Sequence, residues 1–444
     1  MKYEPVSDEI IRSERVDFAY EKIRLENGLT VLVAPMKGYR TANAAYATAF
    51  GSVDQRFVFD GEEISLPAGV AHFLEHKMFE SEEGDAFDRY AETGANANAY
   101  TGFERTCYVF GASDRVDESL DILLDTVSHP WFTEATVAKE QGIIGQEIRM
   151  YEDSPDWRLM FSVFDCLYFN CPLKQDIAGS VESIAKITPQ LLYTCTRAFY
   201  NPSNMVLAVA GNITRDQVLA ALDRADLPQG GAAVQKLPAS EPEQIRERGA
   251  TVEMAVSRPV LGLGFKERPR PAAERLRWEI MADLLGELLI GDITPLYRRL
   301  YDEGLVNSGF STDVFIGEGY FCILFSGETR DPGAVRAALL DEIARLRREG
   351  IRQEDFELCR NLLYGEAVGG FESAESVAGA LASLALRGED LFAELELLAT
   401  LTVEDLEGAL KELLDEDRSA TVLLRPAQSE DNGGCGCEKS EGEA

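Results

Sequence analysis

Histidine occurs only three times in this 444-residue sequence, and two of the three stand four residues apart, at His72 and His76. Residues i and i+4 share one face of an α-helix, so both imidazoles can reach a single metal ion if this segment is helical. Glu75 lies on the same face. The order His-x-x-Glu-His is the inverted zincin pattern, in which two histidines bind zinc and the glutamate handles a proton. The motif therefore predicts a helix here and a zinc site on one side of it.

A catalytic zinc site usually takes three protein ligands, so a third is needed. His129 precedes a proline, which favours an extended or turn conformation, and we expect a structural role for it. Residues 133–150 carry apolar side chains at helical spacing and are expected to form a helix that ends before Pro155. Glu140 and Glu147 are seven residues apart on one face of that helix. The residues alone leave both carboxylates open as the third ligand.

Four segments of the sequence carry a close resemblance to a known family. They are residues 69–76 (Gly-Val-Ala-His-Phe-Leu-Glu-His), 94–101 (Gly-Ala-Asn-Ala-Asn-Ala-Tyr-Thr), 140–147 and 151–155 (Tyr-Glu-Asp-Ser-Pro). The sequence resembles the insulinase/pitrilysin-type (inverzincin) zinc metallopeptidases, in their half-length bacterial form related to mitochondrial processing peptidase. The resemblance runs from about residue 18 to about residue 426 and is more specific in the first half.

The resemblance assigns roles to individual residues. Glu147 follows His76 by 71 residues (147 − 76 = 71), the offset of the family's distal ligand, so it implies one zinc ion per chain held by His72, His76 and Glu147. Glu75 then acts as the general base, a role worth about 10²–10⁴ in rate. Glu140 matches the accessory acidic residue that supports catalysis from two helical turns away.

The resemblance also implies a substrate site at Asn98, Ala99 and Tyr100. In the family, the matching segment is a sheet edge beside the zinc helix, where an extended peptide adds as one more strand. Small residues there let the peptide backbone approach and hydrogen-bond with little sequence preference. Without the family, the simpler interpretation is a turn rich in Asn and Ala before a strand at 106–110.

Composition restricts the partners and the location. A net charge of −34 disfavours nucleic acid and anionic membranes. The acidity would suit cationic peptides if it lines the active chamber, and an acidic solvated surface is an equal alternative. The sequence has no 18-residue apolar run and no apolar signal region at its start, so we expect no membrane segment and a cytoplasmic location. Its eight cysteines show no disulfide framework and are expected to be reduced.

The order of predicted elements is similar in the two halves of the chain. Strands are expected at 21–25, 29–33, 44–49, 205–212, 260–265, 320–326 and 421–425, and helices at 214–222, 273–289 and 332–348. This order is what the family's two-domain clam produces, and it implies an α+β fold with two similar α/β sandwich domains of mostly antiparallel sheet, forming half of a clam-shell chamber. We expect a zinc-binding peptidase domain at 1–224, a linker at 225–249, a peptidase-like domain without the zinc motif at 250–426, and a disordered tail at 427–444 with Cys435 and Cys437.

The second half departs from the family in one respect. Active single-chain relatives place an Arg and a Tyr there to stabilise the oxyanion of the tetrahedral intermediate. In the matching stretch Asn307 occupies the Tyr position, and Arg298 or Arg299 falls out of clear register. The resemblance therefore implies a dimer, with a related subunit that lacks zinc favoured over a second copy of this chain.

The function that the sequence predicts is a zinc-dependent endopeptidase that hydrolyses peptides or small unfolded polypeptides inside a closed chamber. The alternative is a non-catalytic subunit that binds peptides or supports assembly. Members of that second kind usually lose part of the zinc motif, whereas His72, Glu75, His76 and Glu147 are all present.

Overall fold

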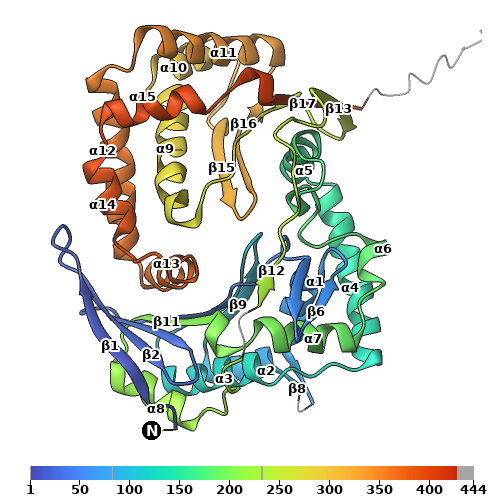
Figure 1. Ribbon diagram of the computed structural model, residues 1–444, viewed down its shortest axis with the longest axis vertical. Coiled ribbons are helices and arrows are strands. Elements are labelled where there is room, and N and C mark those ends of the chain that lie inside the picture. Colours follow the sequence, from blue (N-terminus) through green and yellow to red (C-terminus); the bar gives the residue numbers. More distant parts are fainter. Residues whose placement is uncertain (1, 83, 232–233, 428–444) are drawn as a thin grey trace, which may run out of the picture.

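The computed structural model describes residues 2–82, 84–231 and 234–427, which form two sheets flanked by helices (Figure 1). The first part contains strands β1 (Pro5–Arg12), β2 (Ala19–Leu25), β3 (Thr30–Pro35), β4 (Ala42–Thr48), β5 (Arg56–Phe59), β6 (Glu62–Ser65), β7 (Glu80–Ser81), β8 (Gly84–Asp85), β9 (Asn96–Thr101), β10 (Thr106–Ala112) and β11 (Met205–Gly211). Its helices are α1 (Val70–Met78), α2 (Ala86–Thr93), α3 (Val116–Ser128), α4 (Glu134–Glu152), α5 (Pro155–Leu167), α6 (Val181–Ile184), α7 (Pro189–Phe199) and α8 (Arg215–Arg224).

The second part repeats the mixture of strands and helices. Its strands are β12 (Gln235–Lys236), β13 (Gly249–Met254), β14 (Val260–Lys266), β15 (Ser311–Gly317), β16 (Tyr320–Glu328) and β17 (Ser419–Pro426). Its helices are α9 (Ala272–Ile290), α10 (Pro295–Asp302), α11 (Pro332–Glu349), α12 (Gln353–Gly369), α13 (Ala374–Leu386), α14 (Ala393–Thr400) and α15 (Val403–Glu412).

Both large sheets are mainly antiparallel. The first has the order β1-β2-β3-β11-β4-β10-β9, and only β11 and β3 run parallel. The second has the order β13-β17-β14-β16-β15, and only β13 and β17 run parallel. Strand β11 lies in the middle of the first sheet and is buried along its whole length, as its continuous apolar run predicts. The predicted α+β fold with two similar halves is confirmed, and the strands expected at 21–25, 260–265, 320–326 and 421–425 are all present.

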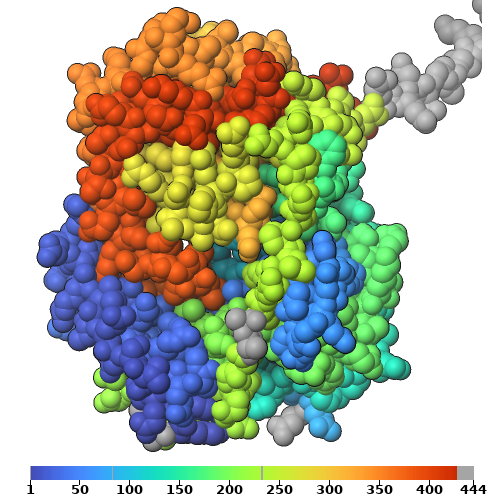
Figure 2. Space-filling model, in the orientation of Figure 1, coloured from blue at the N-terminus to red at the C-terminus, as the bar shows by residue number. Residues whose placement is uncertain are grey.

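Each large sheet is covered on one face by a helix from the other half of the chain. Helix α13 places Val377 and Leu381 in one buried cluster with Leu32 and Ala208 of the first sheet. Helix α5 in turn packs against β14 and β17 of the second sheet. Helix α13 near the C-terminus therefore lies directly against the blue N-terminal strands (Figures 1 and 2).

Two glycines of β14 allow helix α5 to approach the second sheet closely. A Cβ atom at Gly264 would lie 2.3 Å from Cγ1 of Val163, and one at Gly262 would lie 2.9 Å from Cγ2 of the same residue. Glycine in a strand interior commonly marks such a close approach. The apolar residues of the segment 260–265 (Val-Leu-Gly-Leu-Gly-Phe) thus favour a strand, and its two glycines leave the space in which helix α5 packs.

Glu241 anchors the polar segment between the two halves. Its carboxylate accepts backbone N–H bonds from Phe169, Asn170 and Cys171 at 2.9, 2.7 and 2.9 Å. It also accepts a 2.6 Å bond from Nζ of Lys266, and the two side chains are only 6% and 4% exposed. Burial alone would raise the pKa of Glu241, but the Lys266 ammonium and the N–H groups outweigh burial and lower it.

Replacing Glu241 with alanine is expected to lower the free energy of unfolding by about 3–5 kcal/mol, because it leaves the buried Lys266 ammonium without its counter-charge. Urea unfolding followed by circular dichroism would measure the change. Glu243→Ala is the matched control, since Glu243 and its partner Arg268 have side chains 68% and 63% exposed. Exposed pairs of this kind contribute about 0–1 kcal/mol. Equal losses for the two variants would contradict the anchoring role.

The structure also bears on the expectations about membranes and thiols. In the described part of the chain, no helix combines the length and the apolar character that crossing a membrane requires. Six cysteines there are free and buried: Cys107, Cys166, Cys171, Cys195, Cys322 and Cys359. The remaining two, Cys435 and Cys437, lie outside the described residues together with the predicted tail beyond Ala427.

Candidate metal centre

Helix α1 carries the His-x-x-Glu-His motif, as predicted. It begins after Gly69, which has a φ of +93°. A Cβ atom at this position would lie 2.5 Å from the carbonyl oxygen of Ala178, so both the backbone conformation and the space favour glycine. Phe73 and Leu74 are fully buried in the first core, which holds the helix in place. Glu75 and His76 stay half-buried on the opposite side.

Helix α4 supplies the carboxylates and also forms where the sequence predicts it. Thr133 begins the helix with a reciprocal capping box with Thr136. Val137, Ile144 and Ile148 are buried in the first core, which fixes the rotation of the helix. This rotation directs Glu140 and Glu147 toward α1, against which α4 packs.

The structure brings His72, His76 and Glu147 together. Nε2 of His72 lies 3.6 Å from Oε1 of Glu147, and Nε2 of His76 lies 3.3 Å from Oε2 of the same carboxylate. One ligand atom from each of the three side chains lies within 4.8 Å of the others. Within the described ranges, no other set of three or more His, Cys, Asp or Glu side chains meets this criterion.

These donors fit a zinc ion. Tetrahedral zinc with bonds of roughly 2.0–2.1 Å places its ligands about 3.3–3.4 Å apart, close to the two observed separations. Two imidazole nitrogens and one carboxylate oxygen are also a ligand set of catalytic zinc sites. His72 directs Nε2 into the group, while its buried Nδ1 has no hydrogen-bond partner among the described residues. Because Nε2 faces the Glu147 carboxylate, it is the nitrogen of His72 that is placed to bind a metal ion.

Glu140 contacts the other nitrogen of His76. Its Oε1 lies 3.0 Å from Nδ1 of His76, and the Glu140 residue is 8% exposed. A carboxylate at Nδ1 fixes the tautomer and the orientation of a metal-binding imidazole. Burial alone would lower the pKa of His76, but the hydrogen bonds to Glu140 and Glu147 outweigh it and raise the pKa to about 10.

Zinc binding at pH 7 is expected to release a proton from His76. The metal-free imidazole is charged below its pKa of about 10, and zinc accepts only the neutral ring. The apparent zinc affinity should therefore rise about tenfold for each unit of pH between 7 and 9. Glu147 adds no proton, because His72 and His76 hold its pKa well below the usual range. Titration calorimetry in buffers of different ionisation enthalpy would count the protons, and a count of zero would contradict the expectation.

Glu147 is held from a second side by Tyr151. The phenol donates a 2.6 Å hydrogen bond to Oε1 of Glu147. Its ring stacks on Trp157 at 4.9 Å, and Nε1 of Trp157 donates to Asp176 at 2.5 Å. The sequence analysis did not identify Tyr151 as a site residue. Tyr151 follows Glu147 by four residues on the same helix, and this spacing could have indicated that the two side chains are in contact.

Strand β9 lies at the edge of the first sheet and contacts α1. Asn98 and Tyr100 are exposed, whereas Ala99 faces the core from the other side of the strand. The segment is thus an edge strand and not a turn before a hairpin. Its last residue, Thr101, donates a 2.6 Å hydrogen bond to Oε2 of Glu75, a contact that the sequence analysis missed.

A hollow of about 510 Å³ adjoins His76 and Glu140. Its apolar lining consists of Phe79, Phe87, Trp131 and Ile143, and the rings of Phe79 and Phe87 stack at 4.4 Å. Phe87 and Ile143 are 44% and 45% exposed, so this apolar surface is open beside His76 and Glu140.

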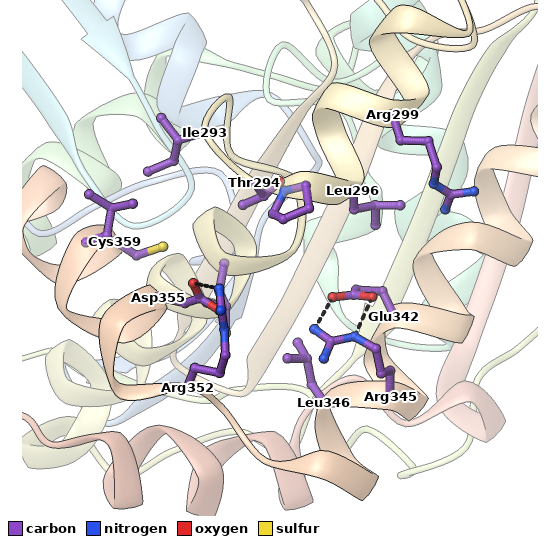
Figure 3. A pocket seen from close by; sticks show the side chains of 13 residues that line it. Ile293, Thr294, Leu296, Arg299, Glu342, Arg345, Leu346, Arg352, Asp355 and Cys359 are labelled. Carbon is purple, nitrogen blue, oxygen red and sulfur yellow. Dashed lines mark hydrogen bonds and ion pairs between the residues drawn. The ribbon is translucent and has the colours of Figure 1, made fainter.

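The second-half residues named above have no hydrogen bond or ion pair to this group among the described residues. Asn307 bonds to Glu328 and accepts the N–H of Gly309. Arg299 instead lines a cavity of about 530 Å³ between α9, α10, α11 and α12 (Figure 3). Four charged side chains of that cavity pair within its wall, Arg345 with Glu342 and Arg352 with Asp355. His129 pairs with Asp125 at the surface.

Comparison with known proteins agrees with this geometry. Residues 62–180 match the family described as Insulinase (Peptidase family M16), and residues 186–363 match the Peptidase M16 inactive domain. The chain is 37% identical over 413 residues to an uncharacterized zinc protease of Bacillus subtilis, YmfH, covering 91% of this chain and 96% of that protein.

Solved structures show the same relationship. An M16-like peptidase from Alicyclobacillus acidocaldarius is 32% identical, with a TM-score of 0.90 and coverage of 94% of this chain and 100% of that one. Pitrilysin shares the fold at 18% identity and a TM-score of 0.73, and the match covers 96% of this chain but 47% of pitrilysin. This chain belongs to the insulinase family of peptidases, family M16.

Proposed function

We propose that this chain is a zinc-dependent endopeptidase that hydrolyses peptides or small unfolded polypeptides. The observation that carries the proposal is the convergence of His72, His76 and Glu147, with Glu75 beside them on α1. The names of relatives as zinc proteases support it. The intact set of four residues favours catalysis over the alternative role of a peptide-binding or assembly subunit.

Each residue then has a defined task. His72, His76 and Glu147 would hold a zinc ion, which would lower the pKa of a bound water and so supply a nucleophile for a peptide carbonyl near neutral pH. Glu75 takes the proton of the attacking water and returns it to the departing amine. Glu140 keeps the His76 ring oriented through Nδ1, and Tyr151 keeps the Glu147 carboxylate in place.

The edge of β9 is proposed as the place where the peptide backbone binds. Asn98, Ala99 and Tyr100 belong to the outermost strand of the sheet, so their outer backbone groups can pair with an extended chain. The alternation of β9 would direct Asn98 and Tyr100 away from the core side that Ala99 occupies.

The test is removal and return of the metal. Dialysis against a chelator should abolish hydrolysis of an unstructured peptide, and one equivalent of zinc should restore it. Metal analysis of the same samples links activity to zinc content. Undiminished hydrolysis by a preparation shown to lack metal would rule the proposal out.

We also propose that the active form is a dimer, which closes a chamber around the peptide. The match to 47% of pitrilysin supports this, because the present fold accounts for about half of that chain. The presence of Asn307 where the family places a Tyr supports it as well, since an oxyanion donor would then come from a second subunit. A related subunit without the zinc motif is favoured over a second copy. The buried, unpaired thiols are compatible with a reducing cytoplasm.

Mixing this chain with a related subunit that carries the Arg and Tyr is expected to raise peptide turnover by about 10²–10³, the usual effect of an oxyanion donor. The measurement compares hydrolysis of one short peptide by the isolated chain, by the related subunit and by the mixture. The mixture should also elute as one complex in size exclusion. Full turnover by the isolated chain would exclude the heterodimer and leave the zinc assignment in place.

A further inference from the structure

Three threonines stand side by side across β9, β10 and β4. The strand register pairs Thr106 with Thr101 on one side and with Thr48 on the other. Thr48 and Thr106 are fully buried. Each of them donates its hydroxyl to a backbone carbonyl, Thr48 to Phe199 at 2.6 Å and Thr106 to Phe50 at 2.9 Å. The hydroxyls of Thr48 and Thr106 are therefore occupied by hydrogen bonds to the backbone and have a structural role.

Thr101, at the edge, makes a different bond. Its hydroxyl lies 2.6 Å from Oε2 of Glu75 on helix α1. An ionised carboxylate can only accept, so the hydroxyl donates and the bond is charge-assisted. The oxygen of Thr106 is 3.4 Å away and its own hydrogen points to Phe50, so it does not compete.

The strand holds this hydroxyl in a fixed direction. A β-branched side chain has few accessible χ1 rotamers, and Thr101 pairs in register with the fully buried Thr106. Its side chain lies on the same face of β9 as Ala97 and Ala99, which pack against the first core. The sheet thus offers a rigid donor to Oε2 of Glu75, and Oε1 has no hydrogen bond to any of the residues that the structure describes.

We propose that Thr101 is a positioning residue, which fixes Oε2 of Glu75 so that Oε1 faces the water and the scissile peptide bond. The inference rests on the proposed function, because it assigns a task only if Glu75 is the base. Without the Thr101 hydroxyl, the Glu75 carboxylate can rotate about its terminal bond. Oε1 then faces the water for a smaller fraction of the time. The loss falls on the chemical step and not on peptide binding or on the zinc ligands.

The test is a pair of substitutions at one position. Thr101→Val keeps the β-branched shape and deletes the hydroxyl, and Thr101→Ser keeps the hydroxyl and deletes the methyl group. In the zinc-loaded protein, Thr101→Val should lower kcat about ten- to a hundredfold, the usual effect of a hydrogen bond to a charged group. KM and zinc content should stay as in the original protein. Thr101→Ser should recover most of kcat.

A second variant separates catalysis from folding. Thr106→Val removes the neighbouring hydroxyl, whose partner is the carbonyl of Phe50, so it should lower the thermal midpoint without the loss of kcat. Equal kcat for Thr101→Val and the original protein, or equal losses for Val and Ser at position 101, would overturn the inference. Glu75→Gln distinguishes failure of the inference about Thr101 from failure of the proposed function. If Glu75→Gln keeps its turnover, the proposed function itself is wrong.

Discussion

Replacing Glu75 with glutamine is expected to lower peptide turnover about 10²–10⁴-fold while the protein still binds one zinc ion. The amide cannot take a proton from water, so the general base is lost. Zinc should remain, because Glu75 is not one of the three side chains whose ligand atoms converge. The Thr101 hydroxyl can still donate to the amide oxygen, so the side chain should keep its place.

Turnover of an unstructured peptide and zinc content by atomic emission would be measured on the same preparation. Glu134→Gln provides a matched control, since it makes the same chemical change at an exposed position in the first turn of α4. An empty metal site in Glu75→Gln would mean that Glu75 is a ligand and would contradict its role as base.

Glu147→Gln is expected to weaken zinc binding by more than about 100-fold, and Glu140→Gln by about 10–100-fold. Glu147 faces Nε2 of both histidines, so its loss removes a metal donor. Glu140 meets only Nδ1 of His76, so its loss frees the ring to turn without removing a donor. Each amide keeps the shape of the acid, so the comparison isolates the charge.

Competition with a chromophoric chelator at a fixed pH would give both affinities. The order of the two effects is the informative result. If Glu140→Gln bound zinc more weakly than Glu147→Gln, Glu140 would be the metal ligand and Glu147 the supporting carboxylate, contrary to the proposal.

The two helices that carry His72, His76 and Glu147 could be predicted from the sequence for a local reason. His72 and His76 share a face through the helical repeat alone, and the apolar residues of 133–150 show the same period. Which of Glu140 and Glu147 approaches Nε2 of the histidines could not be read from that period. It depends on how α4 is rotated against α1, and buried residues such as Ile144 and Ile148 determine that rotation.

Contacts between strands and helices that are far apart in the chain could not be predicted from the sequence. Thr101 reaches Glu75 only because β9 lies at the sheet edge beside α1, and pairing order is not encoded in any single strand. The apolar faces of α5 and α13 predict that each helix is buried. They do not indicate that each would cover the sheet of the opposite half. Glu241 was missed because a lone Glu in a polar segment resembles an ordinary solvated residue.

The reciprocal placement of α5 and α13 limits how the molecule can move. A hinge motion that spread the two sheets apart would pull Val163 away from β14 and Val377 away from β11. Each large aliphatic side chain exposed in this way costs about 1.5–3 kcal/mol, and several would be exposed at once. The chain should therefore behave as one rigid body on the timescale of turnover. In the proposed dimer, the opening that admits a peptide would then have to form between the two subunits, and the rate of peptide entry would depend on how fast the subunits separate.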